Sequence, residues 1–182
     1  MRSLASRAEG IPRLPRSPEG TENIWHQFWR TRQAHANAPG VRARATLTQP
    51  ERAQQQFLVE TGSGHHFLVD DAKGGTGSQP IELVAAAMAG CTAFDVITIL
   101  RSKKRQQVTA YEVRVEANQA ERPPQVFVAV HVHHIVTGHD IDPAAVSEAI
   151  RISEDQYGMV AAMLKHTAVI TTTFEVIEKS PA

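Results

Sequence analysis

Hydrophobic and polar residues alternate along several segments of the chain, which is the pattern of strands with one buried face. In residues 41–48, apolar side chains at every second position are separated by Arg42, Arg44 and Thr46. The turn 61-TGSG-64 separates two further alternating runs and predicts a hairpin. We expect strands over residues 41–48, 55–60, 65–70, 108–117, 125–137 and 168–178.

A different pattern covers residues 80–103, where apolar and small residues occupy most faces of a predicted helix. Pro80 suits its first turn, and the basic run 101-RSKKR-105 suits its carboxyl end. A helix that is apolar all round must be buried on all sides, and one small domain can hardly enclose it. The pattern therefore predicts that a second subunit helps to cover this helix. Shorter helices are expected over residues 143–156, where Asp142 is the N-cap, and 159–166.

The expected order of elements is β-β-β-α-β-β-α-α-β, which favours an α+β fold over repeated βαβ units. We assign residues 41–182 to one domain and residues 1–40, rich in arginine and proline, to a flexible extension. The extension lacks the compact apolar stretch of a secretory signal. Its arginines leave targeting to an organelle open, while the single cysteine fits a cytoplasmic protein.

Composition excludes several classes of function. The formal net charge of the 182 residues is zero, so no overall field favours nucleic acid or an anionic membrane. Residues 81–100 have the length of a membrane span, but Glu82 and Asp95 within them favour a buried core helix. Cys91 is the only cysteine, which excludes an intrachain disulfide and a cysteine-built zinc site.

Other candidate sites are weak by spacing. The loop 74-GGTG-77 lacks a phosphate-binding motif and is read as the hinge that starts the helix. His131 and His133 share one strand face, and His134 lies on the other. Two histidines on one face supply only half of the three or four ligands that a zinc site needs, so we expect no metal. We also expect no cofactor. Cys91 lies in the apolar helix with Asp95 one turn later, and spacing alone favours an inert, buried side chain.

The motifs themselves resemble a known family. The segment 80-PIELVAAAMAGCTAFDV-96 is similar to the P-x-E-L-x-x-x-x-x-x-x-C helix of the OsmC/Ohr hydroperoxide reductases, with Pro80, Glu82, Leu83 and Cys91 in the matching positions. The segments 90–106, 126–138 and 153–178 resemble the YhfA-type branch of OsmC-like proteins. The resemblance covers about residues 41 to 178.

This resemblance implies an OsmC-like α+β fold with antiparallel sheets around two long central helices, in an intertwined homodimer. Cys91 would be the catalytic nucleophile that reduces an organic or inorganic hydroperoxide and becomes a sulfenic acid. Glu82 would orient an arginine that stabilises the thiolate. In the family a second cysteine then forms a disulfide, which a dithiol reduces.

The chain departs from this family pattern in two places. Gly158, within 157-YGMV-160, stands where the resolving cysteine is expected. No arginine aligns with the catalytic one, although Arg42 or Arg44, from the same or the other subunit, could substitute. We therefore expect a one-cysteine, peroxiredoxin-type hydroperoxide reductase that uses an external thiol or dithiol. The alternative is a catalytically degenerate dimer that binds a small apolar ligand or a partner.

Overall fold

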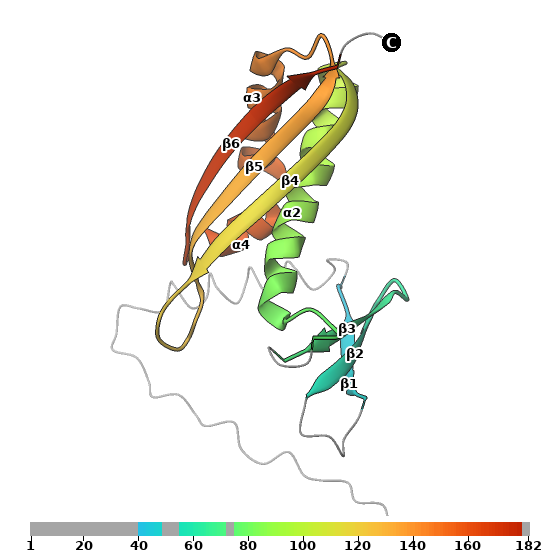
Figure 1. Ribbon diagram of the computed structural model, residues 1–182, viewed down its shortest axis with the longest axis vertical. Coiled ribbons are helices and arrows are strands. Elements are labelled where there is room, and N and C mark those ends of the chain that lie inside the picture. Colours follow the sequence, from blue (N-terminus) through green and yellow to red (C-terminus); the bar gives the residue numbers. More distant parts are fainter. Residues whose placement is uncertain (1–39, 49–54, 72–74, 180–182) are drawn as a thin grey trace, which may run out of the picture. The chain divides into compact units, whose positions relative to one another are not determined.

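The computed structural model describes residues 40–48, 55–71 and 75–179 (Figure 1). The extension predicted over residues 1–40 lies almost wholly outside these ranges. Within them, the elements follow the predicted order β-β-β-α-β-β-α-α-β. They form an α+β protein with two separate three-stranded sheets.

The first sheet contains β1 (Ala43–Leu47), β2 (Gln56–Thr61) and β3 (His66–Asp70), in that order. Both pairs are antiparallel. The predicted hairpin between β2 and β3 is confirmed, and Gly64 adopts a φ of +83° in its turn, a conformation that glycine reaches without a steric cost.

The glycine-rich loop leads directly into the long helix. The Thr76 hydroxyl donates a hydrogen bond to the buried Asp70 carboxylate, and this bond is the largest cause of a lowered pKa at Asp70. A Cβ at Gly77 would come within 2.7 Å of the Leu68 carbonyl oxygen, so a side chain there would displace the backbone. The close approach agrees with a structural role for this loop.

The long helix α2 (Pro80–Thr98) continues as a π-helical turn, η1 (Ile99–Lys103), which matches the predicted range 80–103. By length and composition this helical segment could cross a membrane. Met88, Thr92 and Val96 lie one turn apart and are buried, so one stripe of the helix packs inside the protein. The predicted cover on all sides is not reached within one chain, because only 28% of its most apolar window is buried.

The second sheet contains β4 (Gln107–Gln119), β5 (Phe127–His139) and β6 (Val169–Glu178). β4 and β5 are antiparallel, as expected. β6 is parallel to β5, which corrects the expectation of purely antiparallel sheets. A parallel partner needs a long crossover, and the chain provides one through α3 (Pro143–Ile152), η2 (Ser153–Tyr157) and α4 (Met159–Leu164).

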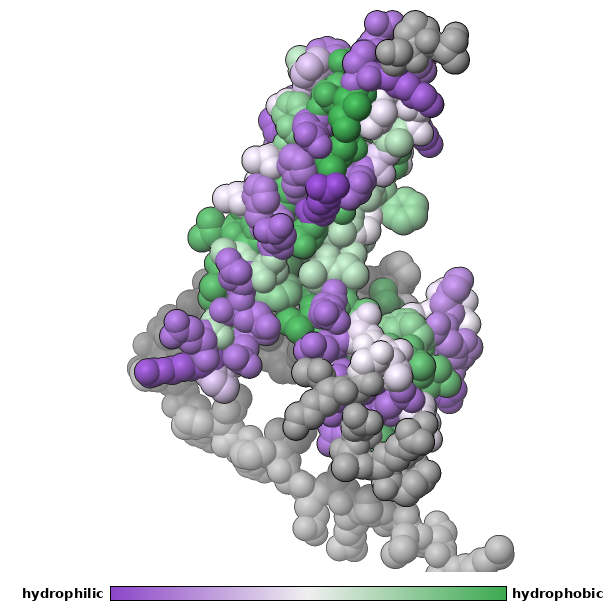
Figure 2. Space-filling model, in the orientation of Figure 1, coloured by the Kyte–Doolittle hydropathy of each residue, from purple (hydrophilic) through white to green (hydrophobic). Residues whose placement is uncertain are grey.

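These helices and α2 cover the same face of the second sheet (Figure 1). Two hydrophobic clusters fill the space between sheet and helices. One surrounds Val96, Leu100 and Val146, and the other surrounds Met88 and Val130. Figure 2 shows hydrophobic and hydrophilic surface side by side over the part of the molecule built from this sheet and α2.

Candidate functional site

A cavity of about 210 Å³ lies between α2, the β5–β6 half of the second sheet, and the segment η2–α4. The sheet and α2 supply its apolar floor, including Met88, Val132 and Ile170. The η2–α4 segment supplies its polar rim. Segments far apart in sequence therefore meet here, and Cys91 lies among them.

Cys91 lies beside the buried stripe of α2. Its neighbours on the helix, Met88 and Thr92, are buried and line the same cavity. Cys91 itself is partly exposed. Spacing alone predicted an inert side chain, and that prediction missed the opening beside the sulfur, which the packing of α4 against α2 creates.

Gly158 lines the same cavity as Cys91. This residue ends η2 and begins α4, with a φ of −62° that any amino acid can adopt. A Cβ at this position would lie 3.3 Å from the Ser153 carbonyl oxygen and 3.4 Å from Ala161 Cβ. A small side chain here therefore needs only a slight adjustment.

Two opposite charges line the cavity: Lys165 at the end of α4 and Glu154 in η2. The Thr172 hydroxyl donates a hydrogen bond to Glu154 Oε1 over 2.5 Å, which fixes the carboxylate against β6. Within the described ranges, Lys165 makes no ion pair. Neither residue was predicted from the sequence, although Gly158, Ala161 or Ala162, and Lys165 have the spacing of a single helix face.

Glu82 does not line this cavity. Its carboxylate accepts a hydrogen bond of 2.8 Å from the Gln79 backbone N–H and completes a capping box at the start of α2. Nine residues of helix separate it from Cys91, which is about 13 Å along the axis and roughly half a turn around it. One chain therefore does not bring Glu82 to the sulfur, and its catalytic role stays a prediction.

Of the two arginines considered as thiolate partners, Arg44 makes an ion pair of 2.5 Å with Glu60 on the neighbouring strand β2. It is not among the residues that line the cavity. A role for Arg42 stays a prediction. Asp95 also lies outside the cavity lining and accepts a long hydrogen bond, 3.5 Å, from the Ser153 hydroxyl.

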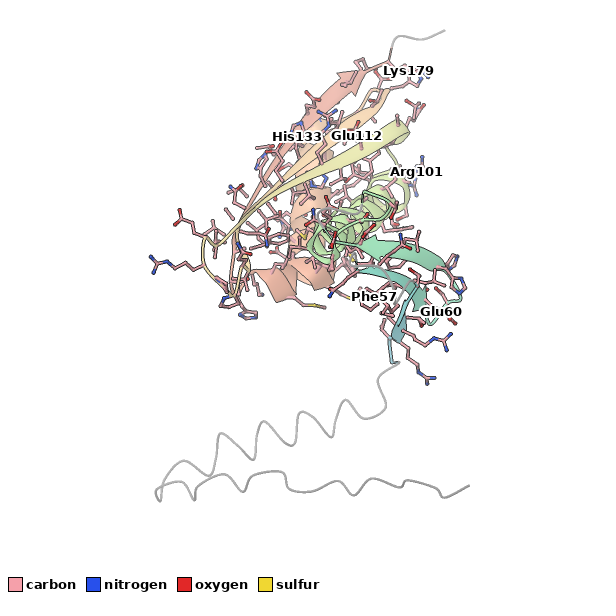
Figure 3. All side chains as sticks on the ribbon, turned by 60° about the horizontal axis from the view of Figure 1, so that its bottom comes forward. Phe57, Glu60, Arg101, Glu112, His133 and Lys179 are labelled. Atoms are coloured by element: carbon pink, nitrogen blue, oxygen red, sulfur yellow. The ribbon has the colours of Figure 1, made fainter. Side chains whose placement is uncertain are left out.

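The histidines of β5 divide between the two faces of the sheet. His131 and His133 point away from the helices and contact Thr171 and Thr173 through their Nδ1 atoms, at 2.9 Å and 2.8 Å. Figure 3 shows His133 and Glu112 on neighbouring strands. Among the residues that the structure describes, no group of three histidine, cysteine or acidic side chains could hold a metal ion.

His134 faces the core and is 1% exposed. Its Nδ1 lies 2.6 Å from the Tyr111 hydroxyl. Burial lowers the pKa of His134 to about 4 and raises the pKa of Tyr111. Both groups are therefore neutral at pH 7, and neither lines the Cys91 cavity.

The fold and the cavity define an α+β protein with one partly exposed cysteine on a long apolar helix. The helical crossover that leads to the parallel strand β6 packs beside this helix. Comparison with known proteins agrees, since the family model described as "OsmC-like protein" matches residues 73–173. Protein YhfA of Escherichia coli strain K12 is 40% identical over 121 residues, which are 66% of this chain and 90% of the relative. The chain belongs to the OsmC-like protein family.

Solved structures share the fold. An OsmC-like protein from Mycoplasma pneumoniae has a TM-score of 0.65 at 11% identity, covering 77% of this chain and 99% of the other. A Legionella pneumophila protein described as an organic hydroperoxide resistance protein OsmC has a TM-score of 0.57 at 16% identity, covering 76% and 98%. The OsmC-like fold expected from the motifs is thus confirmed.

Proposed function

We propose that this protein reduces hydroperoxides through Cys91 in a one-cysteine cycle. The observation that carries the proposal is the position of Cys91 in the wall of an open cavity, on a helix and in a fold shared with OsmC-like proteins. The description of the Legionella relative as an organic hydroperoxide resistance protein supports peroxide as the substrate class.

In the first step, the Cys91 thiolate attacks one oxygen of the hydroperoxide. The O–O bond breaks, the alcohol leaves with a proton, and Cys91 becomes a sulfenic acid. Reactive thiolates are held by a nearby positive charge. We assign this role to Lys165, since no arginine in the described part of the chain lines the cavity.

In the second step, a thiol from outside the chain attacks the Cys91 sulfur and water leaves. Gly158 supports this assignment, because it lines the cavity at the position expected for a resolving cysteine and carries no thiol. A further thiol, or the second sulfur of a dithiol, then releases Cys91. Glu82 supports the site indirectly in this scheme, by fixing the first turn of α2.

The test is hydroperoxide consumption with purified protein and a dithiol, using cumene, tert-butyl and hydrogen peroxide. Cys91→Ser should abolish turnover, and Met88→Leu, which keeps the volume of the cavity wall, should retain it. Mass spectrometry after one equivalent of peroxide should find one added oxygen on Cys91. Turnover by Cys91→Ser at the wild-type rate would contradict the proposal.

A second candidate function is binding of a small apolar ligand by a catalytically inactive protein. The apolar floor formed by Met88, Val132 and Ile170 favours it. Mass spectrometry separates the two candidates. In a binding protein, Cys91 would stay unoxidised after treatment with peroxide. A bound apolar ligand would still protect Cys91 from an alkylating reagent.

We further propose that the protein acts as a homodimer in the cytoplasm. The support is the exposed apolar surface of its helices: Phe94 on α2 is 77% exposed, and Met159 and Met163 on α4 are also exposed. Apolar surface of this kind marks a site of association. A second subunit packed on it would complete the burial of α2 that one chain leaves unfinished.

A further inference from the structure

The rim of the Cys91 cavity carries one charge of each sign, and this arrangement bears on which thiol reduces the enzyme. Lys165 follows the last residue of α4 and Glu154 lies in η2, and both line the cavity. Glu154 is oriented by the Thr172 hydroxyl at 2.5 Å. In the part of the chain that the structure describes, Lys165 has no acidic partner, so its ammonium group is available to a ligand.

The size of the cavity limits the ligand further. Its volume is about 210 Å³. Drug-sized ligands occupy pockets of roughly 300 Å³ or more. The space therefore suits a molecule with few non-hydrogen atoms, the size of one free amino acid.

We propose that the reductant of Cys91 is an amino-acid-type monothiol, which carries an ammonium and a carboxylate close to its sulfhydryl. Lys165 binds the carboxylate, Glu154 binds the ammonium, and the sulfhydryl reaches Cys91 over the apolar floor. This inference rests on the proposed function, because it needs the sulfenic acid that peroxide forms. It adds the chemical class of the reductant.

The chemistry balances with two equivalents of this thiol. The first attacks the sulfenic sulfur, an S–S bond forms as the S–O bond breaks, and the hydroxyl leaves as water with the thiol proton. The second attacks the sulfur of the bound thiol, which releases the Cys91 thiolate and a symmetrical disulfide. No second cysteine of the chain takes part, consistent with Gly158 in the cavity wall.

The experiment compares thiols that keep both charges, lose one of them or lack both. Full-length protein is oxidised with one equivalent of hydrogen peroxide, and the sulfenic acid is verified by mass. It is then mixed with L-cysteine, L-cysteine methyl ester, N-acetyl-L-cysteine or 2-mercaptoethanol. The rate of mixed-disulfide formation is expressed per concentration of thiolate, which removes differences in thiol acidity.

L-Cysteine should react fastest, and loss of either charge should slow the reaction about threefold to fivefold, as for partly exposed charge pairs. Lys165→Gln should remove the preference for L-cysteine over its methyl ester and keep the preference over N-acetyl-L-cysteine. Glu154→Gln should do the reverse. Lys179→Gln and Glu116→Gln, which change charges that do not line the cavity, should alter neither preference.

The outcomes separate the two proposals. If no sulfenic acid forms, the proposed function and this inference both fail. If sulfenic acid forms but all thiols react alike, or Lys165→Gln leaves the preferences unchanged, only the inference is overturned. Each measurement is a ratio of the rates at which two thiols react with the same protein. A variant that is generally less active or less folded would slow both reactions and leave this ratio unchanged.

Discussion

Cys91 on α2 and Gly158 at the start of α4 line the same cavity, although they are distant in sequence. In the family pattern, Gly158 stands at the position of the resolving cysteine, and this position lies in the wall of the cavity that Cys91 lines. A cysteine at residue 158 would therefore line the same cavity as Cys91.

The first prediction is that Gly158→Cys forms a disulfide with Cys91 after oxidation by peroxide. The backbone at residue 158 has a φ open to any side chain, and a Cβ would meet its nearest neighbour at 3.3 Å, so the variant should fold. We expect loss of both free thiols after one equivalent of peroxide and restoration by dithiothreitol. Ala162→Cys, which places a thiol elsewhere on the cavity wall, is the comparison variant. Two unreacted thiols in Gly158→Cys after peroxide treatment would contradict the assignment of residue 158 as the position of the resolving cysteine.

The second prediction concerns Glu82 as a capping residue. Glu82→Ala removes the acceptor for the Gln79 N–H and should lower the free energy of unfolding by about 1 kcal/mol. Glu82→Gln keeps a capping oxygen and should retain both stability and the rate of Cys91 oxidation. Denaturant unfolding and stopped-flow oxidation measure these two quantities.

A different result would restore the direct role that the family resemblance implies. If Glu82→Gln folds with unchanged stability but Cys91 reacts with peroxide at least tenfold more slowly, the carboxylate charge itself acts on the reaction. The partner subunit would then be the place to look for the arginine that Glu82 orients.

The sequence predicted the elements well because their signals are local. Alternation along β2 and β4, and the run of apolar residues after Pro80, depend on nearest neighbours. The direction of β6 could not be read in this way, since a strand has the same alternation whether its partner is parallel or antiparallel. Only the crossover through α3 and α4 decides it.

In the candidate site, too, a local signal could be predicted from the sequence and a contact made by tertiary packing could not. Cys91 was found because its motif is contiguous, whereas Lys165 and Glu154 join it only through the packing of η2 and α4 on α2. Glu82 shows the opposite case. It belongs to the motif, but the helix carries it away from the sulfur, where its hydrogen bond caps the first turn.

The third prediction is a loss of stability at acid pH that originates at His134. Its pKa is about 4 in the folded protein, because of burial, against about 6.5 in an unfolded chain. Between these values the unfolded state binds more protons, so stability is complete above pH 6.5 and falls as the pH drops towards 4. A difference of about 2.5 pH units corresponds to about 3 kcal/mol.

Urea unfolding from pH 7.5 to 4 measures this effect. The double variant His134→Leu/Tyr111→Phe removes both partners of the buried pair and should show a shallower decline than the wild-type protein. His131→Gln changes another histidine of β5, on the outer face of the sheet, and should keep the wild-type slope. Equal slopes in all three proteins would exclude His134 as the source.

The fourth prediction tests the proposed homodimer at Phe94. This side chain is 77% exposed and lies on the side of α2 away from the buried Thr92 and Val96. A buried aromatic residue at an interface is typically worth about 2 kcal/mol or more, so Phe94→Asp should weaken dimerisation by at least about thirtyfold. Ile177→Asp, which introduces the same charge at an exposed apolar residue on the outer face of the second sheet, should leave it unchanged. Sedimentation velocity over a range of concentrations distinguishes these results. A monomeric wild-type protein, or a Phe94→Asp dimer as tight as the wild type, would mean that another partner covers this face of α2.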